Sequence, residues 1–152
     1  MTLSGELMVV DFAPAHQDAA AELINANLGA RFDVRDDSQN PDLFDIAASY
    51  RDACFLVGLL GGELVATGAL LTQSAGPARI VRMHTAPQHR RCGFAARIVC
   101  ELERRAVLRG VAEIVLDTEL AWEDAQAFYE RAGYVEYARD AFDVRYRKRL
   151  KP

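Results

Sequence analysis

Residues 81–95 read VRMHTAPQHRRCGFA, and this stretch contains the features that decide the fold. The apolar run over 79–85 predicts a strand, and Pro87 ends it because proline lacks the backbone N–H that a strand ladder needs. The residues after Gly93 predict a long helix that reaches Arg109 and is ended by Gly110. The stretch therefore predicts a strand that leads through a basic, glycine-containing turn into a helix.

The turn at 90–95 places positive charge where that helix begins. The first backbone N–H groups of a helix have no partner inside it, and the helix dipole is positive at this end. Arg90 and Arg91 add two guanidinium groups. Gly93 lets the backbone approach an anion without a Cβ in the way, and Ala95 keeps the next turn small. The turn indicates a diphosphate site, and the alternative is a basic loop that is simply solvated.

Outward from this stretch, the apolar patterns predict strands that alternate with helices in one half of the chain and form hairpins in the other. The predicted strands are 7–12, 54–60, 63–71, 79–85, 111–118, 134–137 and 142–146, and the predicted helices are 15–27, 41–51, 94–109 and 122–132. A polar loop is expected over 29–42, and Gly61-Gly62 predicts a tight hairpin turn with positive φ. The expected fold is α/β, with a mixed, mostly antiparallel sheet and helices on both faces.

Composition sets the class of protein. The chain has 152 residues, 51% of them hydrophobic and 26% charged, which fits one globular domain over 1–152. A net charge of −4 argues against a nucleic-acid partner. The first ten residues have no basic start and no long apolar run, so we expect a cytoplasmic protein without a membrane anchor. Cys54, Cys92 and Cys100 are too irregularly spaced for a disulfide framework or a zinc cluster, and we expect free thiols and no metal.

A second cluster follows the predicted strand at 111–118. It contains Ala125, Phe128, Tyr129, Glu130, Gly133 and Tyr134. Together with Arg90, Gly93 and Ala95 it resembles the GNAT superfamily of acyl-CoA-dependent N-acyltransferases, whose members share a Q/R-x-x-G-x-G/A turn and a later A-x-x-F/L-Y-E-x-x-G-F/Y helix end. The resemblance covers about 55–137 and implies the GNAT fold, acetyl-CoA as cosubstrate, and direct acetyl transfer to an amine in a ternary complex.

The resemblance also implies roles for individual residues. The strand that includes His84 would bind the acetyl and pantetheine portion through the backbone of Met83 and Thr85. Tyr129 would donate a proton to the departing CoA thiolate, and its alternative role is that of a core aromatic. Trp122 stands where the family often has an asparagine, so one cofactor contact is replaced or lost. The residues that would wrap the pyrophosphate are Arg90, Arg91, Cys92, Gly93, Phe94 and Ala95.

An alkylamine is mostly protonated at neutral pH, so the reaction needs a base. Family members of the histone type carry a glutamate where this chain has Arg79. Asp117, at the end of the 111–118 strand, is the first candidate, and its alternative role is to cap the next helix. His84 is the second candidate, with packing as its alternative. Cys92 at the helix start could favour an acyl-cysteine, but direct transfer is the family norm.

The acceptor amine is expected to contact 28–45 and 137–142, which are polar and partly acidic. The aspartates that could hold a cationic amine, or that could simply be solvated, are Asp33, Asp36, Asp37, Asp42 and Asp45. We expect an N-acetyltransferase acting on a small-molecule primary amine. The alternatives are a peptide or protein N-acetyltransferase and a non-catalytic acyl-CoA sensor, and the basic C-terminal strands could form a homodimer.

Overall fold

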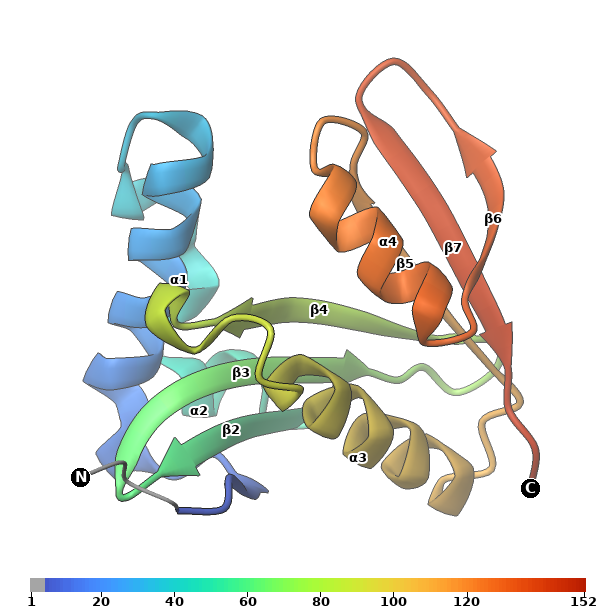
Figure 1. The fold of residues 1–152 in the computed structure, drawn as a ribbon. Helices are drawn as coiled ribbons and strands as arrows, with labels where there is room; N and C mark the ends of the chain where they lie inside the picture. Colours follow the sequence, from blue (N-terminus) through green and yellow to red (C-terminus); the bar gives the residue numbers. More distant parts are fainter. Residues whose placement is uncertain (1–4) are drawn as a thin grey trace.

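The computed structural model describes residues 5–152, which form one seven-stranded sheet with helices on both faces (Figure 1). The strand order is β1-β2-β3-β4-β5-β7-β6, and every neighbouring pair is antiparallel except β4 and β5. The strands are β1 Met8–Asp11, β2 Cys54–Leu60, β3 Glu63–Leu71, β4 Ala78–Thr85, β5 Glu113–Glu119, β6 Val135–Arg139 and β7 Asp143–Arg149. The helices are α1 Gln17–Phe32, α2 Ile46–Ser49, α3 Phe94–Leu108 and α4 Glu123–Arg131. The predicted mixed, mostly antiparallel sheet is confirmed.

Strand β2 explains how the two faces are covered. Its residues point alternately to opposite faces, and both faces are buried, so its sequence is a continuous apolar run. Leu56 belongs to the cluster that α3 and α4 complete, which includes Ile98. Phe55 belongs to the opposite cluster, which α1 and α2 complete and which includes Ile24. Figure 1 accordingly shows α3 in front of the sheet and α2 behind it.

Strands β4 and β5 separate along their length. They pair only where Ala78 meets Ile114 and Arg79 meets Val115, at the start of β4. Beyond this point β4 stays paired with β3 as far as Thr85, whereas β5 stays paired with β7 as far as Glu119. The sheet therefore opens into two halves in its middle, and the carboxyl ends of β4 and β5 lie on opposite sides of the opening (Figure 1).

The Gly61-Gly62 turn is confirmed, with φ of 58° and 84°. The first helix is longer than predicted, because α1 continues through Gly29 and ends at Asp33 with φ 57°. A Cβ on Gly29 would lie 2.7 Å from the Cβ of Arg35, so this glycine makes room for the returning chain and does not end the helix.

The segment after α1 also differs from the prediction. The expected loop over 29–42 contains 3-10 turns at Asp37–Gln39 and Pro41–Leu43. The expected helix over 41–51 is reduced to α2, Ile46–Ser49, because the Asp45 carboxylate caps it by accepting from the Ala48 N–H. Local hydrogen bonds from backbone N–H groups to the side chains of short polar residues therefore replace helical ones here.

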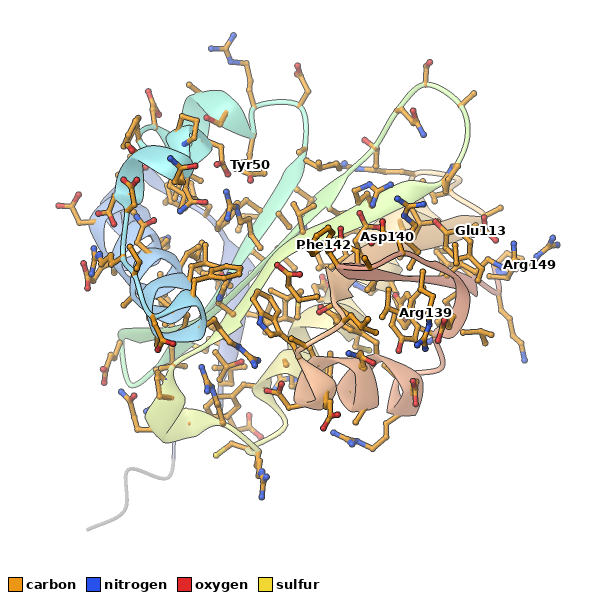
Figure 2. All side chains as sticks on the ribbon, turned by 90° about the horizontal axis from the view of Figure 1, so that it is seen from above. Tyr50, Glu113, Arg139, Asp140, Phe142 and Arg149 are labelled. Atoms are coloured by element: carbon orange, nitrogen blue, oxygen red, sulfur yellow. The ribbon has the colours of Figure 1, made fainter. Side chains whose placement is uncertain are left out.

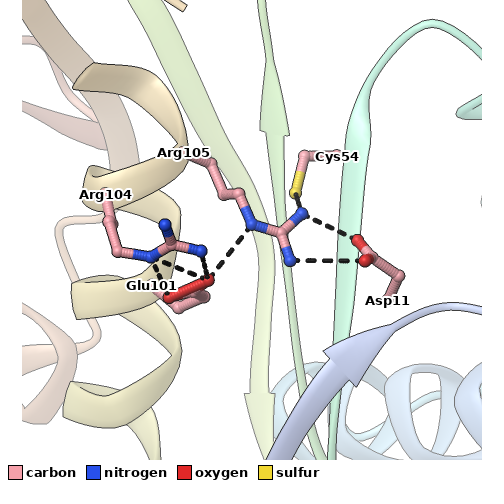
Figure 3. A network of polar contacts seen from close by, with 5 residues as sticks. All are labelled: Asp11, Cys54, Glu101, Arg104 and Arg105. Carbon is pink, nitrogen blue, oxygen red and sulfur yellow. Dashed lines mark hydrogen bonds and ion pairs between the residues drawn. The ribbon is translucent and has the colours of Figure 1, made fainter. Parts of the chain in front are cut away.

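Arg105 of α3 joins this helix to the edge of the sheet (Figure 3). Its guanidinium donates to the Asp11 carboxylate of β1 at 2.8 and 3.3 Å, and its Nε donates to Glu101 at 3.1 Å. Its Nη1 also lies 3.6 Å from the Sγ of Cys54 in β2. The three cysteines are free thiols, as expected. No helix within residues 5–152 is both long and apolar enough to cross a membrane.

Candidate functional site

A cavity of about 1070 Å³ fills the opening between β4 and β5. Its walls are the end of α1, most of β4, the turn before α3 with the first residues of that helix, the end of β5 and one side of α4. The predicted site residues that line it are Met83, His84, Thr85, Arg90, Arg91, Gly93, Phe94, Ala95, Asp117 and Tyr129. Cys92 is exposed, does not line the cavity, and has its Sγ 3.7 Å from the Arg90 carbonyl oxygen. The structure thus brings the two sequence clusters together in one cavity.

The turn before α3 is arranged as a cradle. Arg91 and Gly93 have φ of 63° and 81°, so the chain curls through two left-handed residues before the helix begins at Phe94. No side chain of the described residues caps the start of α3, and a Cβ on Gly93 would meet nothing within 4 Å. The first N–H groups of α3 are therefore free to bind an anion at the cavity wall.

Arg82 forms a β-bulge in β4. Its φ is 57°, and the register between β3 and β4 shifts at this point. The Thr67 hydroxyl donates to the Arg82 carbonyl oxygen at 2.8 Å, which holds the bulge from β3. The Arg82 side chain donates to both carboxylate oxygens of Asp42 at 2.6 and 3.0 Å, and Tyr50 donates to the same carboxylate at 2.6 Å. The bulge is thus joined to the segment between α1 and α2.

His84 lies beyond the bulge and is half-buried. Asn27 of α1 places its Nδ2 3.0 Å from the Thr85 carbonyl oxygen and 3.4 Å from the His84 Nδ1. Burial, followed by the positive charges of Arg82, Arg31 and Arg90, lowers the pKa of His84 to about 3. His84 is therefore neutral at physiological pH, and its low affinity for a proton makes it a poor base.

Tyr129 faces the cavity from α4. Its ring packs edge-on against Phe128 and Tyr134, with centroids 5.0 and 5.9 Å apart, so its position is fixed. Burial raises its pKa well above the ordinary value, and the hydroxyl is protonated at neutral pH. No hydrogen bond joins this hydroxyl to another of the described residues, and since none of their fully buried side-chain oxygens or nitrogens lacks a partner, the hydroxyl oxygen must be accessible, as expected for a residue that lines the cavity. A bound ligand can therefore accept its proton.

Asp117 and Glu119 are the acidic residues at the end of β5. Asp117 lines the cavity, is exposed, and accepts from Arg79 Nη1 at 3.0 Å through one carboxylate oxygen, which leaves the other free. Glu119 is the last residue of β5 and is not among the lining residues. Burial and the nearby carboxylates of Asp143 and Asp140 raise the pKa of Glu119.

The mouth of the cavity is spanned by a contact between α1 and the start of α4, which we call the mouth bridge: Arg31, Phe32, Trp122 and Asp124. Arg31 donates to the Asp124 carboxylate at 2.7 and 2.9 Å and lies 4.8 Å from the centre of the Trp122 ring. The Phe32 and Trp122 rings are 5.5 Å apart. Trp122 therefore both packs against α1 and lines the cavity. It is the residue that stands where the GNAT pattern often has an asparagine.

Sequence reasoning missed the contribution of α1 to this site. Asn27 and Arg31 line the cavity, but each contacts residues far along the chain. The only sequence signal is that Asn25 and Asn27, poor helix formers, stand inside an otherwise apolar helical run, and both are buried.

Most of the aspartates expected to attract a cationic amine are already paired within the protein. Their partners are Ser38 for Asp36, Arg35 for Asp37, Arg82 and Tyr50 for Asp42, and the Ala48 N–H for Asp45. Asp33 ends α1. In the second expected region, Asp140 accepts from the backbone of Phe142 and Asp143 and so shapes the β6–β7 turn, where Phe142 is exposed (Figure 2). These contacts favour a structural role for the aspartates.

Known proteins with a similar sequence or a similar fold identify the family of this chain. Residues 20–134 match the Acetyltransferase (GNAT) family. The chain is similar to an aminoglycoside N(6')-acetyltransferase type 1 of Serratia marcescens, with 29% identity over 117 residues that cover 72% of this chain and 78% of that protein. Its fold resembles that of a GNAT-family acetyltransferase of Staphylococcus aureus (TM-score 0.87, 18% identity, 96% and 100% of the two chains covered). It also resembles the PaiA N-acetyltransferase of Thermoplasma acidophilum in complex with coenzyme A (TM-score 0.79, 12% identity, 95% and 99% covered). The chain therefore belongs to the GNAT family of acetyltransferases.

Proposed function

We propose that this protein transfers the acetyl group of acetyl-CoA to a primary amine of a small molecule, directly and within a ternary complex. The observation that carries the proposal is the cavity between β4 and β5, which the anion cradle at 90–95 and the Tyr129 hydroxyl line together. The coenzyme A bound in the PaiA structure supports the choice of cosubstrate. The aminoglycoside named for the Serratia relative supports a small-molecule amine as acceptor.

In this proposal the cofactor lies along β4 and reaches the start of α3. The backbone of Met83 and Thr85 binds the acetyl and pantetheine portion, with His84 between them. Ala86 N donates to Val65 O of β3, so strand alternation turns the backbone groups of Thr85 and Met83 away from β3 and toward the cavity. The pyrophosphate takes the free N–H groups and guanidinium groups of the turn Arg90, Arg91, Cys92, Gly93, Phe94 and Ala95, with Cys92 contributing backbone only.

The reaction forms one C–N bond and breaks one C–S bond. The neutral amine attacks the thioester carbon, and Asp117 accepts the proton that the amine loses, directly or through water. The carbonyl then re-forms and expels the CoA sulfur as a thiolate. Tyr129 donates its proton to that sulfur, and because burial keeps the pKa of this hydroxyl high, the tyrosinate then takes up, through water, the proton that Asp117 accepted from the amine, which returns both residues to their starting states.

The first prediction concerns Tyr129. Acetyl-CoA is incubated with a panel of aminoglycosides, polyamines and peptides, and thiol release is followed for the native chain and for Tyr129→Phe. We expect the native chain to acetylate a small-molecule amine and Tyr129→Phe to lower kcat by about 100-fold or more, the usual contribution of a general acid. The Kd of CoA should stay within a few-fold, because the ring remains in place.

Tyr134→Phe is the matched control. Its hydroxyl belongs to the same aromatic cluster but donates to Glu103 at 2.8 Å, and it does not line the cavity. We expect this variant to lose stability and to keep its kcat. If acetyl-CoA neither raises the melting temperature nor yields thiol with any amine, the proposed function fails. If only peptides are acetylated, the small-molecule acceptor is wrong and the peptide alternative takes its place.

A further inference from the structure

The contacts of His84 favour one tautomer of its imidazole ring. The Thr85 carbonyl oxygen can only accept a hydrogen bond, so the Asn27 atom 3.0 Å from it must be the amide nitrogen. The same nitrogen lies 3.4 Å from the His84 Nδ1, and it has two protons and no lone pair to offer. A hydrogen bond between these two atoms therefore forms only if the His84 Nδ1 accepts, and a neutral imidazole that accepts at Nδ1 carries its proton on Nε2.

The opposite tautomer is disfavoured by its neighbours. A proton on Nδ1 would face the Asn27 N–H, donor against donor. A second proton, which would make an imidazolium, would add a positive charge next to Arg82 of β4, Arg31 of α1 and Arg90 of the turn before α3. The groups packed around His84 thus favour one state, neutral with Nε2–H.

This state determines what His84 can do in the cavity. A base needs a lone pair, and the only lone pair on the ring is the one that Asn27 occupies. The Nε2–H can serve an acceptor atom of a bound ligand. Because His84 lies between Met83 and Thr85, whose backbone groups face the cavity, the ligand atoms nearest to it in the proposed complex belong to the acyl end of acetyl-CoA.

We propose that His84 is a catalytic hydrogen-bond donor, whose neutral Nε2–H binds the thioester carbonyl oxygen of acetyl-CoA, and that it is not the base that deprotonates the amine. This inference rests on the proposed function. The oxygen gains negative charge when the amine adds to the thioester carbon and returns it when the C–S bond breaks. A prepositioned donor stabilises that charge without giving up its proton.

The first experiment reads the tautomer without any turnover. The chain has three histidines, His16, His84 and His89, so the ¹⁵N resonances of the imidazole rings are assignable with His84→Gln as reference. We expect His84 to show Nε2–H and an acceptor Nδ1 throughout about pH 5–8, the range in which ordinary histidines titrate. A proton on Nδ1, or a titration in this range, overturns the proposal. Asn27→Asp places an acceptor beside Nδ1 and should move the proton to that nitrogen.

The second experiment compares two substitutions by kinetics. His84→Gln keeps an N–H donor near the position of Nε2 but has no basic atom, whereas His84→Leu has neither. We expect His84→Gln to keep kcat within about ten-fold, with an unchanged pH profile, and His84→Leu to lose about 100-fold or more, the loss typical of a missing oxyanion donor. The Kd of CoA, which has no acetyl oxygen, should stay the same in both variants.

Two results would overturn the inference: equal losses in kcat for both variants, which indicate a base, and a weakened Kd of CoA in His84→Leu with unchanged kcat, which indicates a contact to the pantetheine arm. The outcomes also separate this inference from the proposed function. If the native chain acetylates no amine, the proposed function fails while the tautomer is still measured. If the native chain is active and the tautomer is Nδ1–H, only the role of His84 is lost.

Discussion

Asp42 joins the segment between α1 and α2 to Arg82 of β4. Burial alone would raise the pKa of this carboxyl, but the hydrogen bonds and charge of Arg82 and the hydrogen bond from Tyr50 outweigh it and hold the pKa below its ordinary value. A lowered carboxyl pKa means that the folded state favours the ionised form. Its stabilising contribution is therefore full above the unfolded pKa, about 4, and is lost as the pH falls through the folded pKa.

Asp42→Asn tests this contribution. At neutral pH we expect the free energy of unfolding to fall by about 1–3 kcal/mol, the range for a hydrogen bond to a charged group. The difference between the native chain and the variant should begin to shrink below about pH 4, where the carboxyl of the unfolded chain takes up a proton, and should be smallest once the pH has fallen through the lower pKa of the folded state. Urea unfolding at several pH values measures it. Asp37→Asn, which loses only an exposed pair with Arg35, is the control and should have a clearly smaller effect.

Asp117 and Glu119 are the two carboxylates that could act as the general base, and they differ in position and in proton affinity. Glu119 has the raised pKa and would bind a proton more readily, but only Asp117 lines the cavity. We expect position to decide, because a general base must be within hydrogen-bond reach of the proton that it removes, directly or through one water. Asp117→Asn should lower kcat by about 100-fold or more, most strongly at low pH, and Glu119→Gln should leave kcat within a few-fold. The reverse pattern in steady-state kinetics would make Glu119 the base.

At the scale of elements, substitutions in the turn before α3 should affect CoA binding in a way that equally destabilising substitutions elsewhere do not. Gly93 and Gly62 have nearly the same backbone, with φ of 81° and 84°, and a Cβ on either would meet nothing within 4 Å. An alanine at either position must adopt a left-handed conformation, which costs about 1–2 kcal/mol. Both Gly93→Ala and Gly62→Ala should therefore lower stability by this amount in urea unfolding. Only Gly93→Ala should weaken the Kd of CoA, measured by calorimetry, because only this glycine lies in the anion cradle. Equal CoA affinities would contradict the cradle.

The elements that could be predicted from sequence are those whose signals are local. The Gly61-Gly62 hairpin, α3 with its glycine turn and the Tyr129 helix follow from turn chemistry and apolar periodicity within a few residues. The segment after α1 could not be predicted in the same way. Gly29 resembles a helix end in sequence, yet it is helical because it packs against Arg35, and Asp45 shortens the next helix through a cap.

At the scale of the whole molecule, one wall of the cavity has local sequence signals and could be predicted, whereas the other depends on contacts between distant parts of the chain. The wall formed by 90–95 and Tyr129 was predicted through two motifs of a known family. The α1 wall was not, because Asn27 meets Thr85 across 58 residues of sequence and Arg31 meets Asp124 across 93. Contacts of this range arise only when the sheet brings the two halves of the chain together, and no periodicity encodes them.

The mouth bridge is the feature that connects these halves far from their shared strands. Strands β4 and β5 are paired at only two positions at one end, so the halves are free to separate at the other end. There the bridge joins α1 to α4 through the Arg31–Asp124 pair and the tilted contact between the rings of Phe32 and Trp122. Exposed ion pairs and aromatic contacts each contribute about 1 kcal/mol, so the bridge should control local opening more than global stability.

Trp122→Ala tests this view of the molecule by hydrogen exchange. We expect faster exchange in 119–124 and in the last turn of α1, and no change in the β2–β3 hairpin, because local opening exposes only the segments that the bridge holds. Saturating acetyl-CoA should restore most of the protection, since a ligand bound between β4 and β5 contacts both halves. Phe142→Ala, which removes an exposed aromatic outside the bridge, should exchange like the native chain. Faster exchange throughout the sheet in Trp122→Ala would show instead that Trp122 supports the whole fold, and the two halves would then have to be regarded as one rigid unit.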